Sequence, residues 1–438
     1  MSLIYLATFL FSLTMGALIM PRIVSISQKK NLMDAPDDRK VHPIPVPRLG
    51  GISFLPLTMM SIFLFNILCM TILDAEVKAG DTSTFLRIQC CGMGAMLLFL
   101  VGVADDLVGV DYRVKFLAQT AAAALFPLSG LTFGSLFTAV GWIHVPLWVS
   151  APFTVFLVVY ITNAINLIDG LDGLASGICI IAFALYTAIF LYLRHPFLAS
   201  TCLSVLGVLI VFFVYNIFGG EGSRLQKVFM GDTGSLTLGY FISFLALYLT
   251  RFSGEKVFVF TGSMYAAFAP LVIPLLDVVR VVFLRWRAGA PLFRPDQRHI
   301  HHRLLAAGLT PHRATVVLLL LTLGFVALNL TLSKFLRSSW VVLVNLLVWG
   351  LIIYCIERRA NKVQEVQKVQ EVQKVQEVQE VQKVQEVQRV QEVQEVQKVQ
   401  EVQRVQDVQR VQEFKGSKVQ GLKGAKVKQF KRHTNHDS

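Results

Sequence analysis

Long apolar segments recur along this chain, and their length limits the folds that it can adopt. Each has about 20 residues, the length that an α-helix needs to cross the hydrocarbon core of a bilayer. With 54% hydrophobic residues and a mean hydropathy of +0.58, the chain is too apolar for a water-soluble protein. The sequence therefore predicts an all-α integral membrane protein, a polytopic bundle of about 11 transmembrane helices. The expected helices are 3–24, 50–73, 85–104, 114–130, 146–167, 174–194, 198–217, 234–251, 260–284, 314–333 and 338–357.

Positively charged residues are concentrated in alternate connections between these helices. The first and ninth connections are rich in lysine and arginine, whereas those of opposite parity carry few. Because cytoplasmic loops carry the excess of such residues, we expect the N-terminus outside and the C-terminus inside the cell (inner) membrane. The first segment lacks a basic leader and a cleavage site, so we expect a retained membrane helix rather than a signal peptide. In this orientation the unusual polar motifs share the cytoplasmic face, where we expect one active site.

The stretch Asn163–Ser176, NAINLIDGLDGLAS, places two aspartates between two apolar segments. A charged side chain at the bilayer centre costs about 2.5–3.5 kcal/mol on insertion scales, so acids beside membrane helices suggest a function. If the stretch is helical, Asp169 and Asp172 lie on one face. The alternative is a turn joining two membrane helices, which the neighbouring glycines favour.

The third expected helix ends in GVADDLVGV, where Asp105 and Asp106 are adjacent and Lys115 follows at the start of the next helix. Adjacent carboxylates repel each other unless a cation or a proton lies between them. Mg²⁺ prefers carboxylate and phosphate oxygens and is the expected cation, with Mn²⁺ as an alternative. Simple solvation of a helix end is the competing interpretation.

A third acidic motif, VFMGDTGS, precedes the expected helix 234–251. Asp232 is placed to cap the N-terminus of this helix, which is the simplest interpretation. A helix N-terminus that faces a group of acids is also suited to binding phosphate. Phe229, which we expect to be exposed, is suited to stacking on a nucleobase.

The ninth connection reads RPDQRHIHHRL and combines histidines with arginines. Arginine-rich surroundings favour anionic phosphoryl oxygens, so we expect phosphate binding here rather than a zinc site. Arg39 in the first loop is another candidate to bind phosphate, and the alternative is that it only adds to the positive charge of a cytoplasmic loop. Asp277 lies inside a membrane segment, where an acid is a functional candidate by default. The basic residues expected to bind in the ninth connection are Arg298, His299, His301 and His302.

In this order, the motifs resemble the polyprenyl-phosphate N-acetylhexosamine-1-phosphate transferase family, glycosyltransferase family 4. The resemblance covers residues 1 to about 357 and rests on DDRKVHPIPVPRLGG, GVADDLVGV, NAINLIDGLDGLASG, VFMGDTGSL, PLLDVVRV and RPDQRHIHHRL. It implies a Mg²⁺-dependent phosphotransferase, in which a polyprenyl phosphate attacks the β-phosphate of a UDP-sugar. The products would be polyprenyl-diphospho-sugar and UMP, in the first membrane step of a cell-envelope polysaccharide such as lipopolysaccharide or O-antigen.

The resemblance also implies roles for individual residues. Asp232 would ligate Mg²⁺, Asp105 would deprotonate or position the lipid phosphate, and Asp106 would support metal and substrate. The three histidines would hold the diphosphate as part of the catalytic set. The expected substrate-binding residues are Arg39, Lys115, Asn166, Asp169, Asp172, Asn216, Phe229, Asp277 and Arg298.

Substrate choice follows from the branch of the family that the chain resembles. Ile300 interrupts the three consecutive histidines of the MurNAc-pentapeptide branch, so the chain is more similar to the GlcNAc-1-phosphate branch. UDP-GlcNAc and undecaprenyl phosphate are thus the implied substrates, with another UDP-N-acetylhexosamine or UDP-MurNAc-pentapeptide as alternatives. A homodimer is compatible with this interpretation. A membrane transporter is the competing class, although the polar motifs gather at one face rather than along a path across the bilayer.

The sequence divides into a transferase domain, 1–360, a low-complexity tail of VQE and VQK triplets, 361–413, and a Lys-rich segment, 414–438. Three residues advance a helix by about 300°, so successive valines retreat by about 60° and form no coiled-coil stripe. We expect a solvated tail, partly helical or disordered. The Lys-rich end either contacts anionic lipid or only solubilises the chain. The net charge of +13 comes from this tail and the cytoplasmic loops, and gives no reason to expect nucleic-acid binding.

Overall fold

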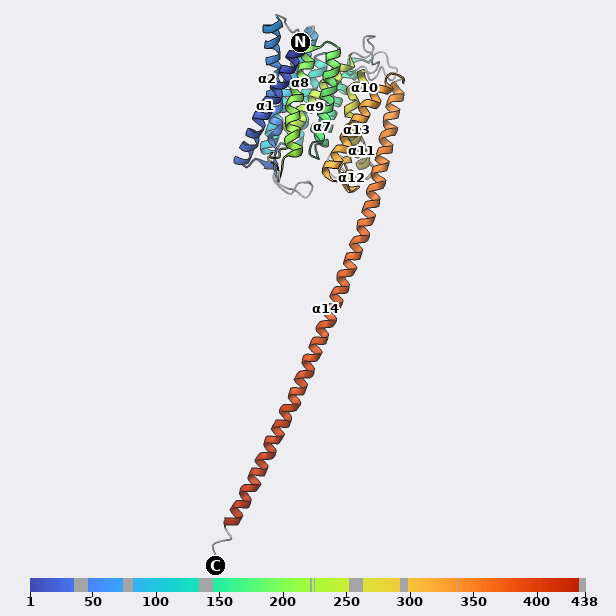
Figure 1. Ribbon diagram of the computed structural model, residues 1–438. Coiled ribbons are helices and arrows are strands. Elements are labelled where there is room, and N and C mark those ends of the chain that lie inside the picture. Colours follow the sequence, from blue (N-terminus) through green and yellow to red (C-terminus); the bar gives the residue numbers. More distant parts are fainter. Residues whose placement is uncertain are drawn as a thin grey trace, which may run out of the picture. The chain divides into compact units, whose positions relative to one another are not determined.

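The structure is a computed structural model that describes residues 1–34, 46–73, 82–133, 145–220, 223, 225–251, 263–291, 298–336 and 338–432 (Figure 1). The chain divides into two compact units, Met1–Val363 and Gln364–Ser438. The six motifs on which the family resemblance rests all belong to the first unit.

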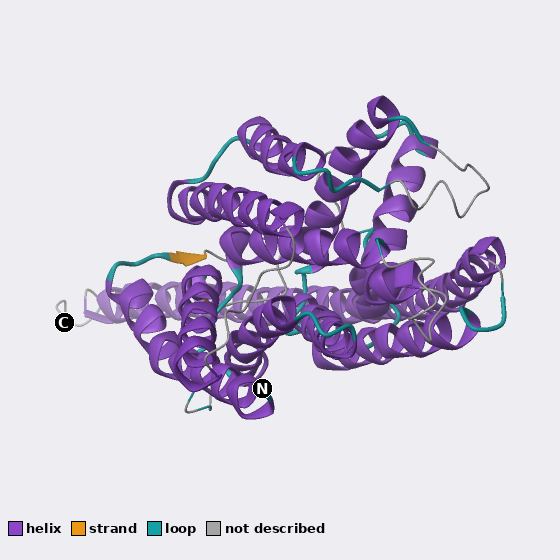
Figure 2. Ribbon diagram, turned by 90° about the horizontal axis from the view of Figure 1, so that it is seen from above, coloured by secondary structure: helices purple, strands orange, loops and turns teal. Residues whose placement is uncertain are grey.

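The described part of the first unit is almost entirely helical (Figure 2). Ten described helices are long and apolar enough to cross a bilayer, which confirms the prediction of an all-α polytopic membrane protein. The described α-helices are α1 Ser2–Lys29, α2 Phe54–Leu73, α3 Thr82–Val108, α4 Tyr112–Leu128, α6 Leu147–Ile168, α7 Leu174–Tyr192, α8 Pro196–Phe218, α9 Gly231–Thr250, α10 Ser263–Phe268, α11 Val272–Arg287, α12 Ile300–Ala306, α13 Pro311–Leu332 and α14 Ser338–Arg432.

Three expected segments differ in detail from what the structure shows. The segment expected at 114–130 is a helix, α4, but has only 17 residues, the lower end of the length that spans a bilayer. The segment expected at 260–284 is divided into α10, the short 3-10 helix η2 (Ala269–Leu271) and α11. Pro270 lies at this division, where its missing N–H cannot continue an α-helical ladder. The helix expected to end at 357 continues to Arg432.

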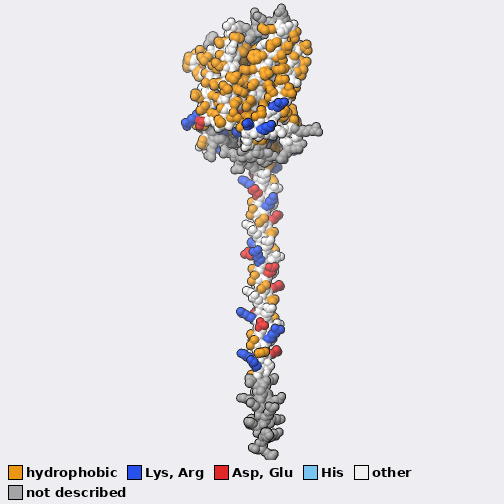
Figure 3. All heavy atoms as spheres, turned by 90° about the vertical axis from the view of Figure 1, so that its left-hand side faces the viewer, with side chains coloured by type: hydrophobic (Ala, Val, Ile, Leu, Met, Phe, Trp, Pro, Cys, Tyr) orange, Lys and Arg blue, Asp and Glu red, His pale blue; other side chains and the backbone are white. Residues whose placement is uncertain are grey.

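Helix α9 forms the centre of the bundle. From Thr233 to Thr250 nearly every residue is buried, and α3, α6, α7 and α10 all contact it. The outer helices instead expose large apolar side chains, as a lipid-facing surface requires. On the face of the first unit that Figure 3 draws, hydrophobic side chains cover the helices, and Lys and Arg gather at one end.

A short strand pair and a glycine-containing turn bring the first loop against the start of α9. Strands β1 (Met33–Asp34) and β2 (Val46–Pro47) are antiparallel. The 3-10 helix η1 (Leu49–Ser53) follows them. The N–H groups of Gly50 and Gly51 donate to the carbonyls of Phe229 and Met230, each at 3.0 Å. The loop before α9 is therefore held by backbone hydrogen bonds.

The second unit consists of the continuing helix of the triplet repeat. Its described residues are helical from Gln364 to Arg432, so the expected tail is helical rather than disordered over this range. The valines of the repeat are about half exposed throughout, for example 57% at Val369 and 58% at Val384. They form no buried face, as the three-residue period predicts.

Candidate active site

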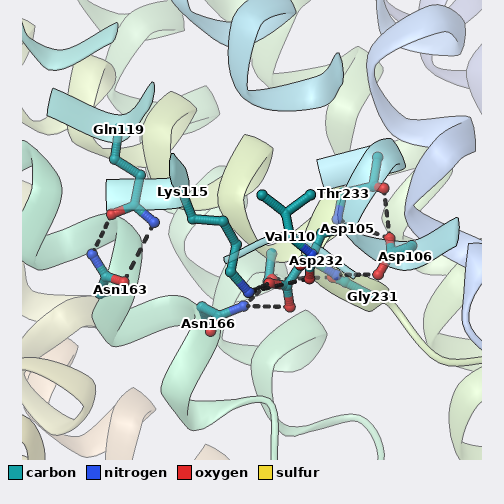
Figure 4. Close-up of polar contacts among 11 residues, drawn as sticks. Asp105, Asp106, Val110, Lys115, Gln119, Asn163, Asn166, Gly231, Asp232 and Thr233 are labelled. Carbon is teal, nitrogen blue, oxygen red and sulfur yellow. Dashed lines mark hydrogen bonds and ion pairs between the residues drawn. The ribbon is translucent and has the colours of Figure 1, made fainter. Parts of the chain in front are cut away.

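Three aspartates from two helices meet at one end of the bundle (Figure 4). Asp105 and Asp106 lie near the end of α3, and Asp232 lies in the first turn of α9. One carboxylate oxygen from each lies within 4.8 Å of the others. Among the described residues, this is the one group of three or more acids, histidines or cysteines with such spacing. Oxygen donors at this spacing fit a hard divalent cation such as Mg²⁺.

Asp106 holds the N-terminus of α9. Its Oδ1 accepts a hydrogen bond from the N–H of Asp232 at 2.8 Å. Its Oδ2 accepts from the N–H and the hydroxyl of Thr233, at 3.0 and 2.6 Å. The first N–H groups of a helix have no partner within the helix, so Asp106 caps α9 from α3. The capping role that the sequence suggested for Asp232 therefore belongs to Asp106, and both oxygens of Asp106 are occupied.

Lys115, in α4, lies between the two other aspartates. Its Nζ is 3.2 Å from Asp105 Oδ2 and 2.9 Å from Asp232 Oδ2. Neutral donors hold the remaining oxygens, with Val110 N at 2.7 Å from Asp105 Oδ1 and Asn166 Nδ2 at 3.1 Å from Asp232 Oδ1. The lysine thus neutralises part of the acidic charge, and the neutral donors fix the orientation of each carboxylate.

Two glycines permit α3 and α9 to approach closely. A Cβ at Gly102 would lie 2.5 Å from the Cα of Thr233, and one at Gly231 would lie 2.4 Å from Oδ2 of Asp106. Gly231 also has φ +68°, a conformation that side-chain-bearing residues rarely adopt. These glycines in the GVADD and MGD motifs are therefore required for the aspartates to meet.

Asp169 and Asp172 lie in a turn between α6 and α7, so the turn alternative is correct and the shared helical face is wrong. Asp172 is buried, forms an ion pair with Lys227, and accepts a hydrogen bond from the Thr315 hydroxyl at its carbonyl, at 2.9 Å. Burial raises the pKa of Asp169 well above its usual value, and the charges of Asp172 and Asp232 raise it further. The two acids of the turn therefore have different electrostatic environments.

Asn216 joins this turn to the segment before α9. Its Oδ1 accepts from the N–H of Gly173 at 2.6 Å, and its Nδ2 donates to the carbonyl of Val228 at 2.8 Å. Phe229 is half-buried rather than exposed as expected, and the Nζ of Lys227 lies 5.8 Å from the centre of its ring. Asn216 thus positions the segment that carries Phe229, while part of the ring stays accessible for stacking.

The histidine segment, His299–His302, begins helix α12, and Asp277 in α11 holds its first residues. Asp277 is only 1% exposed. Its Oδ2 lies 2.8 Å from His299 Nδ1, and its Oδ1 accepts from the N–H of Ile300 at 3.0 Å. A carboxylate at Nδ1 fixes the ring and directs Nε2 toward other partners.

His301 packs against the turn that carries Asp169 and Asp172. A Cβ at Gly170 would lie 2.3 Å from His301 Nε2, so the imidazole directly contacts the backbone of the turn. Burial and the neighbouring rings of His299 and His302 lower the pKa of His301 well below its usual value. Its buried Nδ1 has no hydrogen-bond partner among the described residues. A buried polar atom without a partner is uncommon, so this ring nitrogen is a candidate contact for a ligand bound at the turn.

The structure does not place all the expected ligands in this cluster. Arg39 lies outside the described residues. Arg298 is half-buried, and its Nη1 donates to the carbonyl of Leu284 at 3.3 Å, at the end of α11. This contact thus ties Arg298, the residue before His299, to α11.

Several residues of the site were missed from the sequence. Thr233 lies beside Asp232 in the GDTGS motif, and Lys227 lies two residues before Phe229. Arg280 lies one helical turn after Asp277 and donates to it at 3.0 Å, a spacing that could have suggested the pair. The partner of Lys227 could not be found in this way, because it is 55 residues distant.

Comparisons with known proteins agree with this arrangement. A family model described as glycosyl transferase family 4 matches residues 88–250, which include the three clustered aspartates and the aspartate-containing turn. The chain is 33% identical over 350 residues to a probable undecaprenyl-phosphate N-acetylglucosaminyl 1-phosphate transferase of Bacillus subtilis (strain 168), covering 79% of this chain and 88% of that protein. It is 30% identical over 346 residues to the undecaprenyl-phosphate alpha-N-acetylglucosaminyl 1-phosphate transferase of Escherichia coli (strain K12), covering 76% and 86%. The protein of the same name from Yersinia pestis is 30% identical over 361 residues, covering 80% and 90%.

Proposed function

Because this chain belongs to glycosyl transferase family 4, together with these undecaprenyl-phosphate N-acetylglucosaminyl 1-phosphate transferases, we propose that it transfers GlcNAc-1-phosphate from UDP-GlcNAc to undecaprenyl phosphate. An oxygen of the lipid phosphate forms a bond to the β-phosphorus of UDP-GlcNAc. The bond from that phosphorus to the bridging oxygen breaks, and UMP leaves with the electron pair. The observation that carries the proposal is the cluster of Asp105, Asp106 and Asp232 around Lys115, at the end of an apolar bundle.

The aspartate cluster is suited to holding Mg²⁺. Asp105 and Asp232 are the better ligands, because one oxygen of each is held only by the flexible side chain of Lys115, whereas both oxygens of Asp106 are held by the first residues of α9. Bound there, Mg²⁺ supplies positive charge that offsets the repulsion between the lipid phosphate and the UDP-sugar. Mn²⁺ has the same preference for oxygen ligands and is expected to replace it.

The protein's own groups then position the two anions. Asp105 accepts the proton of the lipid phosphate or orients that phosphate, and Lys115 provides a cation beside it. Asn166, which already donates to Asp232, is placed to orient the nucleotide-sugar. Phosphoryl transfer depends on positioning and charge stabilisation more than on covalent chemistry with the protein. A carboxylate, a lysine and an amide at the site are therefore the kinds of group that the reaction needs.

The nucleotide end of the substrate is assigned to the turn and the segment before α9. Phe229 stacks on uracil, and the nearby pair of Lys227 and Asp172 holds the adjoining part of the nucleotide. The histidine segment binds the diphosphate, with His301 accepting or donating at its unpaired Nδ1. Because the ring of His301 contacts the turn at Gly170, we assign the diphosphate and the nucleotide to one continuous site.

The active site is assigned to the cytoplasmic side of the inner membrane, where UDP-sugars are made. The distribution of lysine and arginine supports this orientation, with the N-terminus outside and the C-terminus inside. Residues 1–360 form the transferase, and the repeat and the Lys-rich end are additions to it.

The proposal is tested with washed membranes, labelled UDP-GlcNAc and undecaprenyl phosphate, with and without EDTA. We expect Mg²⁺-dependent formation of lipid-linked GlcNAc and UMP, lost in Asp232→Asn. The matched control is Asp111→Asn, which changes an aspartate that caps α4 through the N–H of Arg113, outside the cluster. Asparagine caps helices as well as aspartate, so this control should retain activity.

The sugar is tested in parallel arms. UDP-GalNAc and UDP-MurNAc-pentapeptide replace UDP-GlcNAc in otherwise identical reactions. Product from one of these alone would keep the chemistry and change the assigned sugar. Folded protein that releases no UMP from any UDP-sugar would contradict the proposed reaction.

A further inference from the structure

Glu357, in α14, contacts arginines from two other helices. Its Oε1 accepts from Arg303 Nε at 3.0 Å and from Arg280 Nη1 at 3.3 Å, and its Oε2 accepts from Arg303 Nη2. Arg303 belongs to α12 and Arg280 to α11. The side chains of Arg280, Arg303 and Glu357 are 11%, 21% and 33% exposed, so water only partly screens the group. One carboxylate therefore joins three helices.

The same two arginines adjoin both ends of the histidine segment. Arg280 donates to the backbone carbonyl immediately before His299. It also donates, through Nη2 at 3.0 Å, to Asp277, the partner of that histidine. Arg303 immediately follows His302 and lies in the single short helix that carries the segment. Glu357 thus contacts Arg280, which holds the beginning of the histidine segment, and Arg303, which directly follows its end.

We propose that Glu357 is a positioning residue for the transfer reaction, which sets the place of the histidine segment through Arg280 and Arg303. The proposal rests on the proposed function, in which that segment holds the diphosphate. A two-point arginine–carboxylate contact fixes angle as well as distance. Without the carboxylate, both guanidinium groups lose a shared acceptor in a partly buried place, and α12 loses its ion pair with α14.

The first experiment compares Glu357→Gln with Glu365→Gln, a chemically identical change at an exposed glutamate of the same helix in the triplet repeat. Glutamine keeps the size of the side chain and removes its charge. We expect Glu357→Gln to lower kcat by about 10-fold or more, since small displacements of positioning groups have large effects on rate. The KM for UDP-GlcNAc and the thermal midpoint of the detergent-solubilised protein should change much less. Glu365→Gln should match the wild type.

A double-mutant comparison tests the route through Arg303. If Glu357 acts in part through this arginine, the double variant of Glu357→Gln and Arg303→Gln should lose clearly less activity than the product of the two single losses. If the loss of activity in the double variant equals the product of the two single losses, Glu357 and Arg303 act independently, and the route through Arg303 is overturned. Glu357→Asp, which keeps the charge, should recover part of the activity.

Limited trypsin digestion provides a readout that needs no catalysis. The bond after Arg303 lies inside α12, so its cleavage requires local opening of that helix. We expect about fivefold or faster cleavage at this bond in Glu357→Gln than in the wild type and in Glu365→Gln. Unchanged cleavage together with unchanged kcat would overturn the proposal. Faster cleavage in Glu357→Gln, together with a wild type that transfers no sugar, would contradict the proposed function while still showing that Glu357 holds α12 in place.

Discussion

At the scale of residues, two neighbouring aspartates of the site, Asp106 and Asp232, have different roles. Asp106 uses both oxygens to cap α9, whereas Asp232 directs its side chain to Lys115 and Asn166. The sequence names both aspartates as candidates, but it cannot separate them, because the distinction depends on how the end of α3 meets the start of α9. A capping acid contributes to folding, and an acid that holds a cation contributes to turnover.

This distinction predicts different effects on stability. Asp106→Ala should lower the free energy of unfolding by about 1–2 kcal/mol, because it removes the acceptor for three donors at the start of α9. Asp232→Asn should abolish transfer with little change in stability, because Asn166 and Lys115 still surround a polar side chain of the same size. Thermal unfolding in detergent measures both variants, and equal losses of stability would contradict the assignment.

At the scale of helices, small residues set the distance between α3 and α9. Membrane helices pack closely where glycine allows their backbones to approach, because lipid offers no hydrophobic drive for association. Besides Gly102, Gly94 of α3 meets α9, where an added Cβ would lie 2.0 Å from the hydroxyl of Tyr240. The position of the aspartates is thus a consequence of helix packing along α3.

Two Gly→Ala substitutions in α3 test this packing. At Gly102 the added Cβ would meet the backbone of Thr233 at 2.5 Å, whereas at Gly92 it would meet nothing within 4 Å. Gly102→Ala should lose about 1–3 kcal/mol of stability and about 10-fold or more of the transfer rate, since α3 must move away from α9. Gly92→Ala should change stability by at most about 1 kcal/mol and leave the rate unchanged. Equal rates for the two variants would show that the contact does not position the site.

The helices were largely predictable from the sequence, whereas the contacts between them were not. The length and polarity of an apolar segment can be read directly from the sequence, so these properties located the membrane helices. They did not reveal the division at Pro270. The acids and histidines were recognisable by type and motif. Their partners were not, because Lys227 meets Asp172 and Glu357 meets Arg303 only after distant helices pack.

At the scale of the whole molecule, the transferase and the repeat have different physical characters. The first unit buries the tyrosines Tyr186, Tyr240 and Tyr248 almost completely. The described repeat buries none of its valines, and its charges mostly alternate in sign along the helix. The second unit therefore adds no core of its own, and its helix depends on local propensity and on i,i+3 charge pairs.

Removal of the repeat should therefore spare the reaction, provided that the contacts at its base are kept. Arg303 donates to Asn361 at 3.4 Å as well as to Glu357, so a stop codon after Val363 retains both partners. We expect this truncated chain to insert in membranes and to transfer GlcNAc-1-phosphate at no less than about half the wild-type rate per molecule, because no buried contact is lost. Immunoblotting of the membrane fraction, with an epitope at the N-terminus, normalises the rate to the amount of protein. A well-inserted truncated chain with little activity would mean that the repeat takes part in turnover, either by orienting α14 and with it Glu357 or by holding the protein near its substrates.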